Sequence, residues 1–577
     1  MQLPKEAFMT NDLPKSSSGS TGLDAVLKGG FPKERTTLLQ GGTGTGKTIL
    51  GLQFLISGAK NGEPGILVSF EERADAIKQN ARALGWDLDQ LEKEGKLIIL
   101  DALPDPTAVY SGGFDFSGLF ALLEGAVRTL NAKRIVIDAI DILLHLLNDP
   151  SRERNQIYQL HDWLGDHNHT AIITAKLSNG IPDYPFLEFL TDCVISLIPL
   201  NDDRQRLLSV VKYRGSNFSS GTHPYTIAED GLILIPQAET ALHYEKVGQH
   251  ISTGLPVLDS MLGGGYRRGS SIALAGASGT GKTTLACMFA AAASARSERV
   301  LYVNFEESAD NMVSLMSSSG LDLEPALKSN HLKITAFMPE AAGSEEHLHY
   351  NIKAIDEHQP QHLIIDAISA CRRMGSQKAG FSYLLRILNY CRQRGITTLL
   401  TNQITGFQQA HEIYGIGFSS IIDSMIFLDY VQVGGEVNRT LMVLKARGSG
   451  HSNQYREFTI TTDGIHFEDI YTGKGGMLTG VARLEEEYRE ELEARKRERS
   501  ITAKQQQIKR LRADLQLDIS ASESEIEEVA VELNAIETEI AISEEARKKR
   551  KMLRTGRDEK NLDQNRALTD SHPGEEE

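Results

Sequence analysis

The 577-residue chain lacks the features that mark secreted, zinc-binding or membrane-spanning proteins. Its four cysteines, Cys193, Cys287, Cys371 and Cys391, form no CxxC pair, and their spacing suits neither zinc nor a disulfide framework. We therefore expect buried, reduced thiols. No run of about 18 apolar residues is present to span a membrane, and the N-terminal stretch MQLPKEAFMTNDLPK lacks the apolar core of a secretory signal. A cytoplasmic protein without a membrane partner is the expectation.

Positive charge is also in deficit. Lys and Arg number 61 against 77 Asp and Glu, so the formal net charge is −16. A protein that acts on duplex DNA usually carries a basic surface, because its affinity depends largely on neutralising phosphates. The acidic balance therefore argues against nucleic acid as a partner, although a local basic channel would be compatible with it.

One module occurs twice along the chain. The motif GGTGTGKT at 41–48 recurs as GASGTGKT at 276–283, with the two lysines 235 positions apart. Other features recur in the same order at nearly the same offset. These are STGL at 20–23 and 252–255, Glu71-Glu72 and Glu306-Glu307, Asp138 and Asp366, and KYRGS at 212–216 and KARGS at 445–449. Internal duplication of one domain explains the whole set.

Short apolar runs between these motifs predict buried parallel strands. Longer amphipathic stretches separate the runs, and strands that alternate with helices imply a parallel sheet with helices on both faces. The predicted strands of the first copy are Gly65–Phe70, Leu97–Leu100, Arg134–Asp138 and Thr170–Thr174. The predicted fold class is therefore α/β, in two tandem domains.

The chain changes character after the second copy. From about Val481 to Leu553 it has almost no Gly or Pro, and Glu, Lys, Arg, Gln and Ala dominate. Apolar residues follow a heptad spacing that is interrupted around Asp518 and Ser522. They are Ile508, Leu511, Leu515, Ile526, Val529, Leu533, Ile536 and Ile540. We expect a coiled coil here, with a solvated helical tail that carries a chance stripe as the alternative.

The motif G-x-x-x-x-G-K-[ST] between a strand and a helix is a specific signal for nucleotide phosphates. Its glycines allow backbone N–H groups to surround phosphate oxygens, and the helix N-terminus adds a positive dipole. We expect Lys47 and Lys282 to reach the β- and γ-phosphates, and Thr48 and Thr283 to hold Mg²⁺. ATP and Mg²⁺ are the expected cofactors.

Two sets of carboxylates accompany the phosphate-binding loops. Asp138 and Asp366 end apolar strands, in RIVIDAID and LIIDAIS, and fit the position that contacts the magnesium shell. Glu71-Glu72 and Glu306-Glu307 follow the strand after each loop helix, where a carboxylate can orient or deprotonate an attacking water. A helix cap and a solvated loop are the simpler alternatives, but repetition in both copies favours a catalytic role. The pattern leaves open which glutamate of each pair acts.

The late K-x-R-G-S motif of each copy follows an apolar strand, at Leu207–Val211 and at Leu441–Leu444. Its basic residues could be solvated strand ends. They could also be arginine fingers that reach a neighbouring subunit's γ-phosphate, which requires a ring or filament.

These stretches together resemble the KaiC family of bacterial clock ATPases and autokinases, within the RecA-like superfamily. The resemblance covers about Leu13 to Ile470. It rests on STGLDAVLKGG, GGTGTGKT, SFEER, GFDFSGL, KYRGSNF, GASGTGKTTL, NFEESAD, FMPEAAGSEEHL, LIIDAIS, FSSIIDSMIFLDY and KARGSGH. It implies two tandem RecA-like P-loop domains and a hexamer of two stacked rings with ATP between adjacent subunits. It also implies slow ATP hydrolysis in the first ring, and Ser/Thr autophosphorylation with ADP-dependent reversal in the second.

The resemblance assigns roles to individual residues. In the first domain it implies ATP binding by Gly44, Thr45, Gly46, Lys47, Thr48, Ile49, Lys212, Tyr213, Arg214 and Ser216. In the second domain it implies ATP binding by Ser278, Gly279, Thr280, Gly281, Lys282, Thr283, Thr284, Arg439, Lys445, Ala446, Arg447 and Ser449. The implied magnesium positions are Thr48, Asp138, Thr283, Glu306 and Asp366. Glu306 would be the general base, with Glu307 beside it and Arg373 near the phosphorylated residues.

Members of the family carry two adjacent hydroxyl residues just ahead of an aspartate in the second repeat. This chain has Ser419 and Ser420 ahead of Asp423, whereas the first copy, aligned on Asp192, has Glu188 and Phe189 at these positions. The asymmetry suggests hydrolysis in the first domain and phosphorylation of Ser419 and Ser420 in the second. Two ordinary serines ahead of a strand are the alternative. The family's second phosphorylated residue is commonly threonine, so rates or order of phosphorylation are open.

The C-terminus departs from the family pattern. The short tail that meets the activator KaiA has no match after about Tyr471, so dependence on KaiA is not expected, whereas KaiB binding to the first ring is an expectation of the resemblance. The helical extension is similar to that of extended KaiC proteins, whose coiled coil could join two hexamers tail to tail into a dodecamer. The expected organisation is a tail at 1–12, ATPase domains at 13–240 and 241–472, a helical coiled-coil extension at 473–555 and a disordered tail at 556–577.

Three functions remain open from the sequence. The first is a KaiC-like ATPase and serine autokinase that keeps time, either as an oscillator or as an hourglass. The second is a RecA-like motor that acts on DNA, and the third is a signalling scaffold that hydrolyses ATP without kinase output. Fold alone cannot separate them. The duplication, the acidic balance and the Ser419-Ser420 pair favour the first.

Overall fold

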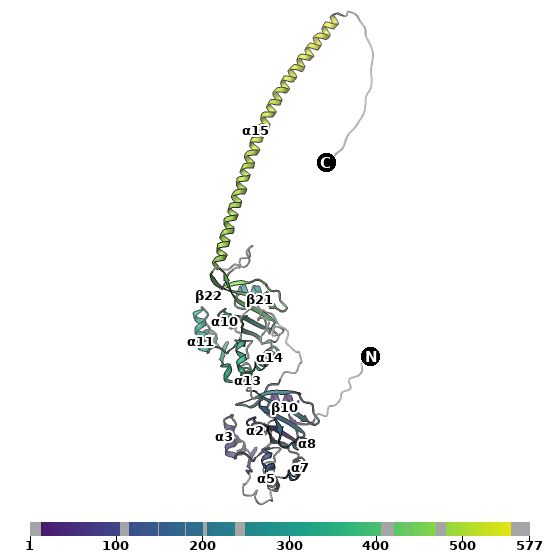
Figure 1. The fold of residues 1–577 in the computed structure, drawn as a ribbon, viewed down its shortest axis with the longest axis vertical. Helices are drawn as coiled ribbons and strands as arrows, with labels where there is room; N and C mark the ends of the chain where they lie inside the picture. Colours follow the sequence, from purple (N-terminus) through teal and green to yellow (C-terminus); the bar gives the residue numbers. More distant parts are fainter. Residues whose placement is uncertain are drawn as a thin grey trace, which may run out of the picture. The chain divides into compact units, whose positions relative to one another are not determined.

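The structure is a computed structural model of the chain. It describes residues 13–103, 115–147, 149–178, 180–199, 205–236, 248–404, 421–433, 435–468 and 480–554. The chain divides into two units, Met1–Gly480 and Val481–Glu577. The first unit holds two α/β domains, and the second holds one long helix, α15 (Figure 1).

The first domain is built on one large sheet with the strand order β12-β11-β10-β9-β3-β7-β6-β4-β5. Its main strands are β3 (Thr36–Gly41), β4 (Gly65–Ser69), β5 (Leu97–Asp101), β6 (Arg134–Asp138), β7 (Thr170–Ser178), β9 (Cys193–Pro199), β10 (Arg206–Tyr213), β11 (Thr222–Ala228) and β12 (Gly231–Leu234). The strands from β9 to β5 are parallel, which confirms the predicted parallel sheet. Strands β10 to β12 add an antiparallel edge that the sequence pattern did not predict. Short strands β1 (Lys15–Ser16), β2 (Phe31–Pro32) and β8 (Ile181–Pro182) lie outside this order.

Helices cover both faces of this sheet, as predicted. On one face, residues such as Leu39 and Leu67 pack with α1 (Thr21–Val26), α2 (Lys47–Lys60), α3 (Ala74–Arg82) and α4 (Leu88–Lys93). On the other face, Leu38 and Ile66 pack with α5 (Ser117–Leu130), α6 (Ile140–Leu147), α7 (Pro150–Asp166) and α8 (Phe186–Leu190). Adjacent residues of one strand thus serve opposite cores, because successive side chains of a strand point to opposite faces. This explains why the strands read as continuous apolar runs.

The second domain repeats the topology, with the strand order β17-β16-β18-β19-β15-β20-β21-β22-β23. Its strands are β13 (His250–Ile251), β14 (Tyr266–Arg267), β15 (Ser271–Gly276), β16 (Val300–Asn304), β17 (Leu332–Ala336), β18 (His362–Asp366), β19 (Thr397–Gln403), β20 (Ser424–Val433), β21 (Glu436–Ala446), β22 (Arg456–Thr461) and β23 (Gly464–Glu468). Its helices are α9 (Pro256–Met261), α10 (Lys282–Ala295), α11 (Ala309–Ser318), α12 (Glu324–Lys328), α13 (Ser344–His358) and α14 (Gln377–Gln393), with 3-10 helices η2 (Pro339–Ala341) and η3 (Ile368–Met374). Two cores again flank the sheet.

The predicted strand bounds hold with small changes. Strand β6 has the predicted limits, and β4 ends one residue early, at Ser69. Strand β7 is longer than the predicted run and continues to Ser178. It continues because Ala175 and Lys176 still pair with β3, and Leu177 pairs with β8. The extension carries polar residues past the apolar run, so periodicity could not reveal it.

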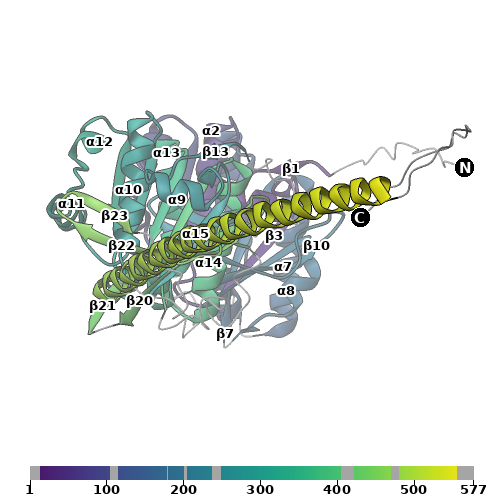
Figure 2. The ribbon, with the colours of Figure 1, turned by 90° about the horizontal axis from the view of Figure 1, so that it is seen from above.

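The C-terminal unit is the helix α15 (Gly480–Arg554), which is continuous in Figures 1 and 2. It occupies the segment for which the sequence predicts a helix. Each of the eight apolar heptad residues, from Ile508 to Ile540, is more than half exposed. Pairing of this stripe as a coiled coil stays a prediction.

Two further expectations concern chemistry and membranes. All four cysteines are free and buried, as predicted. Among the described helices, none combines the length and the apolar character that crossing a membrane would need.

A partly buried carboxylate secures the same corner of each domain. Glu63 pairs with Arg134, the first residue of β6, and Glu298 pairs with His362, the first residue of β18. Arg268 also pairs with Glu298. Burial acts to raise the pKa of Glu298, but hydrogen bonds from Arg268 and His362 outweigh it and lower the pKa to about 2. Burial lowers the pKa of His362 to about 4, so a neutral imidazole donates to the carboxylate at pH 7.

We predict that Glu298→Gln lowers the free energy of unfolding by about 1–3 kcal/mol at pH 7, because the buried His362 and the partly exposed Arg268 lose a charged acceptor. A depressed carboxyl pKa contributes stability that is present above the unfolded value of 4.5 and is lost as the pH falls towards 2. The difference between wild type and variant should therefore shrink across that interval in denaturant titrations. Glu324→Gln, at an exposed carboxylate, is the control, and a pH-independent difference at position 298 would contradict this account.

Candidate active site: two phosphate-binding loops at equivalent sheet edges

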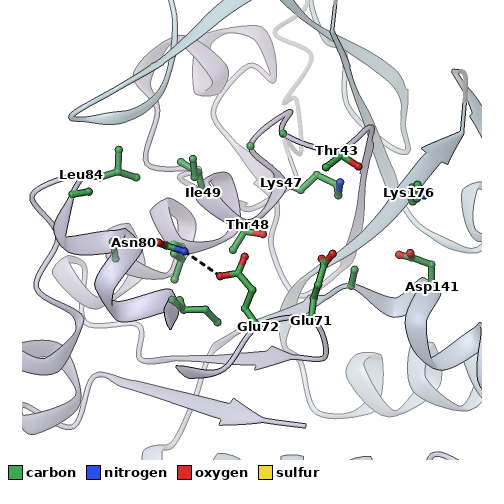
Figure 3. Close-up of a pocket in the computed structure, with 17 residues that line it drawn as sticks. Thr43, Lys47, Thr48, Ile49, Glu71, Glu72, Asn80, Leu84, Asp141 and Lys176 are labelled. Atoms are coloured by element: carbon green, nitrogen blue, oxygen red, sulfur yellow. Dashed lines mark hydrogen bonds between the residues drawn. The ribbon is translucent and has the colours of Figure 1, made fainter. Parts of the chain in front are cut away.

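The parallel strands of the first domain deliver their polar residues to one edge of the sheet. The phosphate-binding loop follows β3, Glu71 and Glu72 follow β4, and Asp138 ends β6. These segments surround a pocket of about 590 Å³ (Figure 3). Its lining residues are Thr43, Gly44, Gly46, Lys47, Thr48, Ile49, Leu52, Glu71, Glu72, Ile77, Asn80, Ala81, Ala83, Leu84, Ala139, Asp141 and Lys176. Ligands of open α/β sheets bind at this carboxyl edge.

The loop geometry depends on a glycine directly before each loop helix. Gly46 has a φ of 89° and Gly281 a φ of 99°, in the left-handed region that glycine adopts without strain. A Cβ on Gly46 would lie 2.7 Å from the Cδ1 atom of Ile227. The hydroxyls of Thr45 and Thr280, both buried, donate to the carbonyls of Gly42 and Ala277 at 2.8 Å. Their side chains therefore brace the loop, which leaves the backbone to meet phosphate.

The loop lysines of both domains donate to carbonyls of their own loops, and their predicted contact with the phosphates stays a prediction. Lys47 Nζ donates to the carbonyls of Gly41 at 2.9 Å and Gly42 at 3.0 Å. Lys282 Nζ donates to the carbonyls of Gly276 at 3.0 Å and Ala277 at 2.7 Å. Burial lowers the pKa of both ammonium groups, and the nearby aspartates act in the opposite direction.

The remaining second-domain loop residues follow the same plan. Ser278, Gly279, Thr280 and Gly281 form the loop ahead of α10, and Thr283 and Thr284 lie in its first turn. In the first domain, Gly44 and Ile49 line the pocket itself.

The two aspartates that end β6 and β18 are buried, and both carboxylate oxygens of each accept a hydrogen bond. Thr48 Oγ1 donates to Asp138 Oδ2 at 2.6 Å, and Thr174 donates to the other oxygen. A hydroxyl beside a carboxylate is the protein's share of a P-loop magnesium site, in which phosphate oxygens and water supply the other ligands. The first-domain residues therefore fit the predicted Mg²⁺. In the described ranges, no three His, Cys, Asp or Glu side chains form a cluster that could hold a metal ion. A P-loop magnesium site takes few ligands from the protein and does not require such a cluster.

In the second domain, one of the two hydrogen bonds to the strand-ending aspartate comes from a different kind of residue. Tyr302 donates to Asp366 Oδ2 at 2.7 Å, and Thr401 donates to Oδ1. The tyrosine is fully buried in β16, at the position that Leu67 holds in β4. The sequence interpretation missed this contact, because a tyrosine in an apolar strand is usually a core residue.

The two glutamates of each pair have different contacts in the structure. Glu72 accepts a hydrogen bond from Asn80 Nδ2 at 3.1 Å, whereas the charge of Glu71 acts on Lys47. Figure 3 shows Glu71 directed toward Lys47 and Glu72 held by Asn80. The first glutamate therefore faces the phosphate end of the pocket.

The second domain has the same arrangement. Glu307 accepts from Asn311 Nδ2 at 3.3 Å, and the charge of Glu306 acts on Lys282. Burial, and then the charge of Asp366, raise the pKa of Glu306. A raised pKa brings a carboxylate closer to the value that suits a base near neutral pH.

Arg373 lies in η3, directly after the Asp366 strand. Its Nε is 2.8 Å from Glu340 Oε1, and its charge acts on Glu306. The predicted position of Arg373 near the phosphorylated serines stays a prediction. Ser419 and Ser420, the predicted phosphorylation sites, lie outside the described residues. The nearby Asp423 is held by Arg392 at 2.8 Å.

The late basic motif of the first domain lies away from the pocket of that domain. Lys212, Tyr213, Arg214 and Ser216 all lie in the described chain, and none lines the pocket. Lys212 donates to the carbonyls of Glu188 and Thr191, both at 2.6 Å. Arg214 donates to the Phe189 carbonyl at 2.8 Å, and Tyr213 donates to the Gly30 carbonyl at 2.9 Å. Ser216 accepts a hydrogen bond from Lys15 at 2.7 Å. This placement is what an element that serves a neighbouring subunit requires.

The second domain repeats this placement in part. Lys445 donates to the Ile422 carbonyl at 2.7 Å, Arg447 lies 3.9 Å from Asp423, Ala446 pairs with Ser424, and Ser449 lies 3.4 Å from His250. Arg439 differs, because its Nε donates to the carbonyl of Gly279 in the loop of its own domain at 3.2 Å.

Several pocket residues escaped the sequence interpretation. The wall formed by Leu52, Ile77, Ala81 and Leu84 offers an apolar surface of the kind that receives a purine ring. Helical periodicity explains these residues equally well as core, so no sequence signal separates the two roles. Lys176, near the end of β7, and Asp141, in the first turn of α6, were also missed.

Two phosphate-binding loops, each with its aspartate and glutamates at the carboxyl edge of a parallel sheet, define a tandem P-loop nucleotide triphosphatase. A family model described as "ATPase: KaiC" matches the chain twice, over residues 16–239 and 251–471. The chain therefore belongs to the KaiC family.

Curated relatives extend over most of the chain. It is 36% identical over 532 residues to the circadian clock protein KaiC2 of Synechocystis sp., covering 91% of this chain and 94% of the relative. It is 36% identical over 466 residues to the circadian clock oscillator protein KaiC of Synechococcus elongatus, covering 80% and 90%. For the circadian clock protein KaiC3 of Synechocystis sp. the values are 34%, 82% and 95%. The alignment with KaiC2 exceeds the share of the first unit, so it extends into α15.

We predict that Glu71→Gln reduces ATP turnover by the first domain about 10²- to 10⁴-fold, because Glu71 is the carboxylate directed at the phosphate end. Glu72→Gln should change turnover little, since Asn80 holds that side chain. Both variants are compared in full-length protein with Lys282→Ala, which silences the second loop, by phosphate release. A larger loss for Glu72→Gln than for Glu71→Gln would reverse the assignment.

Proposed function

We propose that this protein is a KaiC-like timekeeping ATPase whose second domain phosphorylates Ser419 and Ser420 of the protein itself. The observation that carries the proposal is the duplicated site, in which the charge of a glutamate acts on the lysine of each phosphate-binding loop. The names of its relatives, which are circadian clock proteins, support the timekeeping role. The hydroxyl pair, present only in the second copy, supports the division between hydrolysis and kinase chemistry.

In the first domain the loop backbone and Lys47 bind the phosphates of ATP, and Glu71 orients a water for attack on the γ-phosphorus. Mg²⁺ held by Thr48 and Asp138, or by Thr283, Glu306 and Asp366 in the second domain, would neutralise charge on the β- and γ-phosphates. Arg214 and Lys212 serve the neighbouring subunit's site in a ring.

In the second domain a serine hydroxyl replaces water. The Ser Oγ atom attacks the γ-phosphorus, the bond between that phosphorus and the β,γ-bridging oxygen breaks, and ADP leaves. Glu306 accepts the hydroxyl proton, for which its raised pKa suits it. Arg373 keeps positive charge near Glu306 and the accepting serines.

The assembly that fits these roles is a homohexamer with nucleotide at the subunit boundaries. Helix α15 then joins two hexamers through its apolar heptad stripe into a dodecamer. A KaiB-like protein is the partner proposed for the first domain, and KaiA dependence is not proposed, because α15 stands where the family's short tail would be.

The kinase proposal predicts a mass increase of one or two phosphates per chain after incubation with Mg·ATP. Ser419→Ala/Ser420→Ala should remove the increase while ATP hydrolysis by the first domain continues. Glu306→Gln should slow it about 10²-fold or more, and Glu307→Gln should not. Intact-mass spectrometry checks each variant. Wild-type protein that hydrolyses ATP and gains no mass would disprove the kinase role and leave the ATPase role standing.

The assembly proposal predicts that Val529→Glu/Ile536→Glu halves the particle mass, because buried charges in a coiled-coil seam are strongly unfavourable. The matched control is Val531→Glu/Ile542→Glu, which adds the same charges to exposed apolar residues off the seam. Sedimentation with Mg·ATP measures the mass. Equal behaviour of the two variants would contradict pairing through this stripe.

A further inference from the structure

The two nucleotide sites differ in charge at their phosphate end. Besides burial, the pKa of Lys47 responds to the carboxylates Asp138, Asp141 and Glu71 and to the ammonium group of Lys176. The pKa of Lys282 responds only to Asp366 and Glu306 among charged groups of the described chain. The first site therefore has one additional carboxylate and one additional ammonium group.

The sheet register identifies the counterparts of the additional lysine. Lys176 of β7 pairs with Gly41, the first glycine of the first loop, and Gln403 of β19 pairs with Gly276, the first glycine of the second. Two residues earlier, Thr174 and Thr401 make equivalent hydrogen bonds to the two buried aspartates. Lys176 and Gln403 thus occupy the same position.

The additional carboxylate is also specific to the first domain. Asp141 and Ser369 each lie three residues after the buried aspartate of their domain. One oxygen of Asp141, Oδ1, is buried and has no hydrogen-bond partner in the described chain, and the same holds for Ser369 Oγ. Asp141 and Lys176 of the first domain therefore stand at the two positions where the second domain has the neutral residues Ser369 and Gln403.

Both charged residues line the nucleotide pocket. Figure 3 shows Lys176 and Asp141 together on the side of the pocket where Lys47 ends. The Lys176 side chain is exposed and lines the pocket. Asp141 lies beside it, and its buried Oδ1 atom has no hydrogen-bond partner in the described chain, so the charge of this carboxylate attracts the ammonium group.

We propose that Lys176 is a γ-phosphate ligand found only in the first domain, and that Asp141 is the residue that positions it. An ammonium group at the first loop glycine approaches the terminal phosphate from the side opposite the loop helix. A charge-assisted contact to the γ-phosphate strengthens binding of ATP and not of ADP, which lacks that group. Asp141 offsets the added positive charge, so the affinity for diphosphate stays close to that of a site with the neutral pair.

The consequence is a difference in nucleotide preference between the domains. The first domain discriminates ATP from ADP more strongly than the second, so it stays occupied by ATP at ATP/ADP ratios at which the second domain has already exchanged ATP for ADP. The inference rests on the proposed function only in that the first domain binds ATP. It does not depend on hydrolysis or on phosphorylation of serine.

The test measures equilibrium binding of a non-hydrolysable ATP analogue and of ADP to full-length protein. Lys282→Ala leaves the first site as the one observed. In this background Lys176→Gln, which installs the second domain's residue, should weaken the ATP analogue about tenfold or more and ADP less than about twofold. Lys176→Arg should retain the preference, and Lys93→Gln, at an exposed lysine of α4 outside the pocket, should change neither affinity.

Asp141→Ser tests the positioning role. It should reduce the preference for the ATP analogue in the presence of Lys176 and have no effect on that preference in the Lys176→Gln variant, because a residue that acts through another is non-additive with it. A merely structural role of Asp141 would instead weaken both nucleotides in both backgrounds.

The reverse substitution gives an outcome that damaged folding cannot imitate. With Lys47→Ala silencing the first loop, Gln403→Lys combined with Ser369→Asp should increase the preference of the second site for the ATP analogue. Equal weakening of both nucleotides by Lys176→Gln, or no weakening of either, overturns the inference. Because binding is measured without turnover, a protein that neither hydrolyses ATP nor phosphorylates itself would defeat the proposed function without touching this result.

Discussion

The parallel sheet is the constraint on which both sites depend. Parallel strands all point their carboxyl ends to one edge, so residues at the ends of three different strands meet there although the chain separates them. The loop after β3, Glu71 after β4 and Asp138 at the end of β6 come together for this reason. Buried apolar cores on both faces hold these strands rigidly, which sets the phosphate-binding groups before any nucleotide arrives.

The sequence predicts the class of fold and the loop and carboxylate residues that gather at each sheet edge, because loop glycines, a loop lysine and strand-ending carboxylates have few other uses in combination. It predicts less where one residue type serves two purposes. Tyr302 donates to Asp366 from within an apolar strand, and Leu52 faces the pocket from an amphipathic helix. Periodicity identifies both as core and is silent on their second role. The antiparallel edge escaped for a related reason, since apolar alternation does not encode strand direction.

The two copies of the domain have the same strand order, but some contacts around their sites differ. The pattern of a glutamate toward the phosphates and its neighbour held by an asparagine is the same in both copies, although Asn80 and Asn311 come from different positions of the following helix. By contrast, Asp366 takes a tyrosine hydroxyl where Asp138 takes a loop threonine. The glutamate–asparagine contact is thus kept in both copies, whereas one hydroxyl that holds the strand-ending aspartate differs between them.

The exposed stripe of α15 bears on how the whole particle would respond to nucleotide. A helix of 75 residues is about 110 Å long at 1.5 Å per residue. In the proposed hexamer six such helices leave one ring, and pairing any one of them raises the local concentration of the other five. Avidity then multiplies weak individual contacts, so that the two-ring state would be held strongly by intact rings and hardly at all by single chains. Nucleotide that holds a ring together would then also hold the two rings together, so its loss would cause a steep fall in particle size.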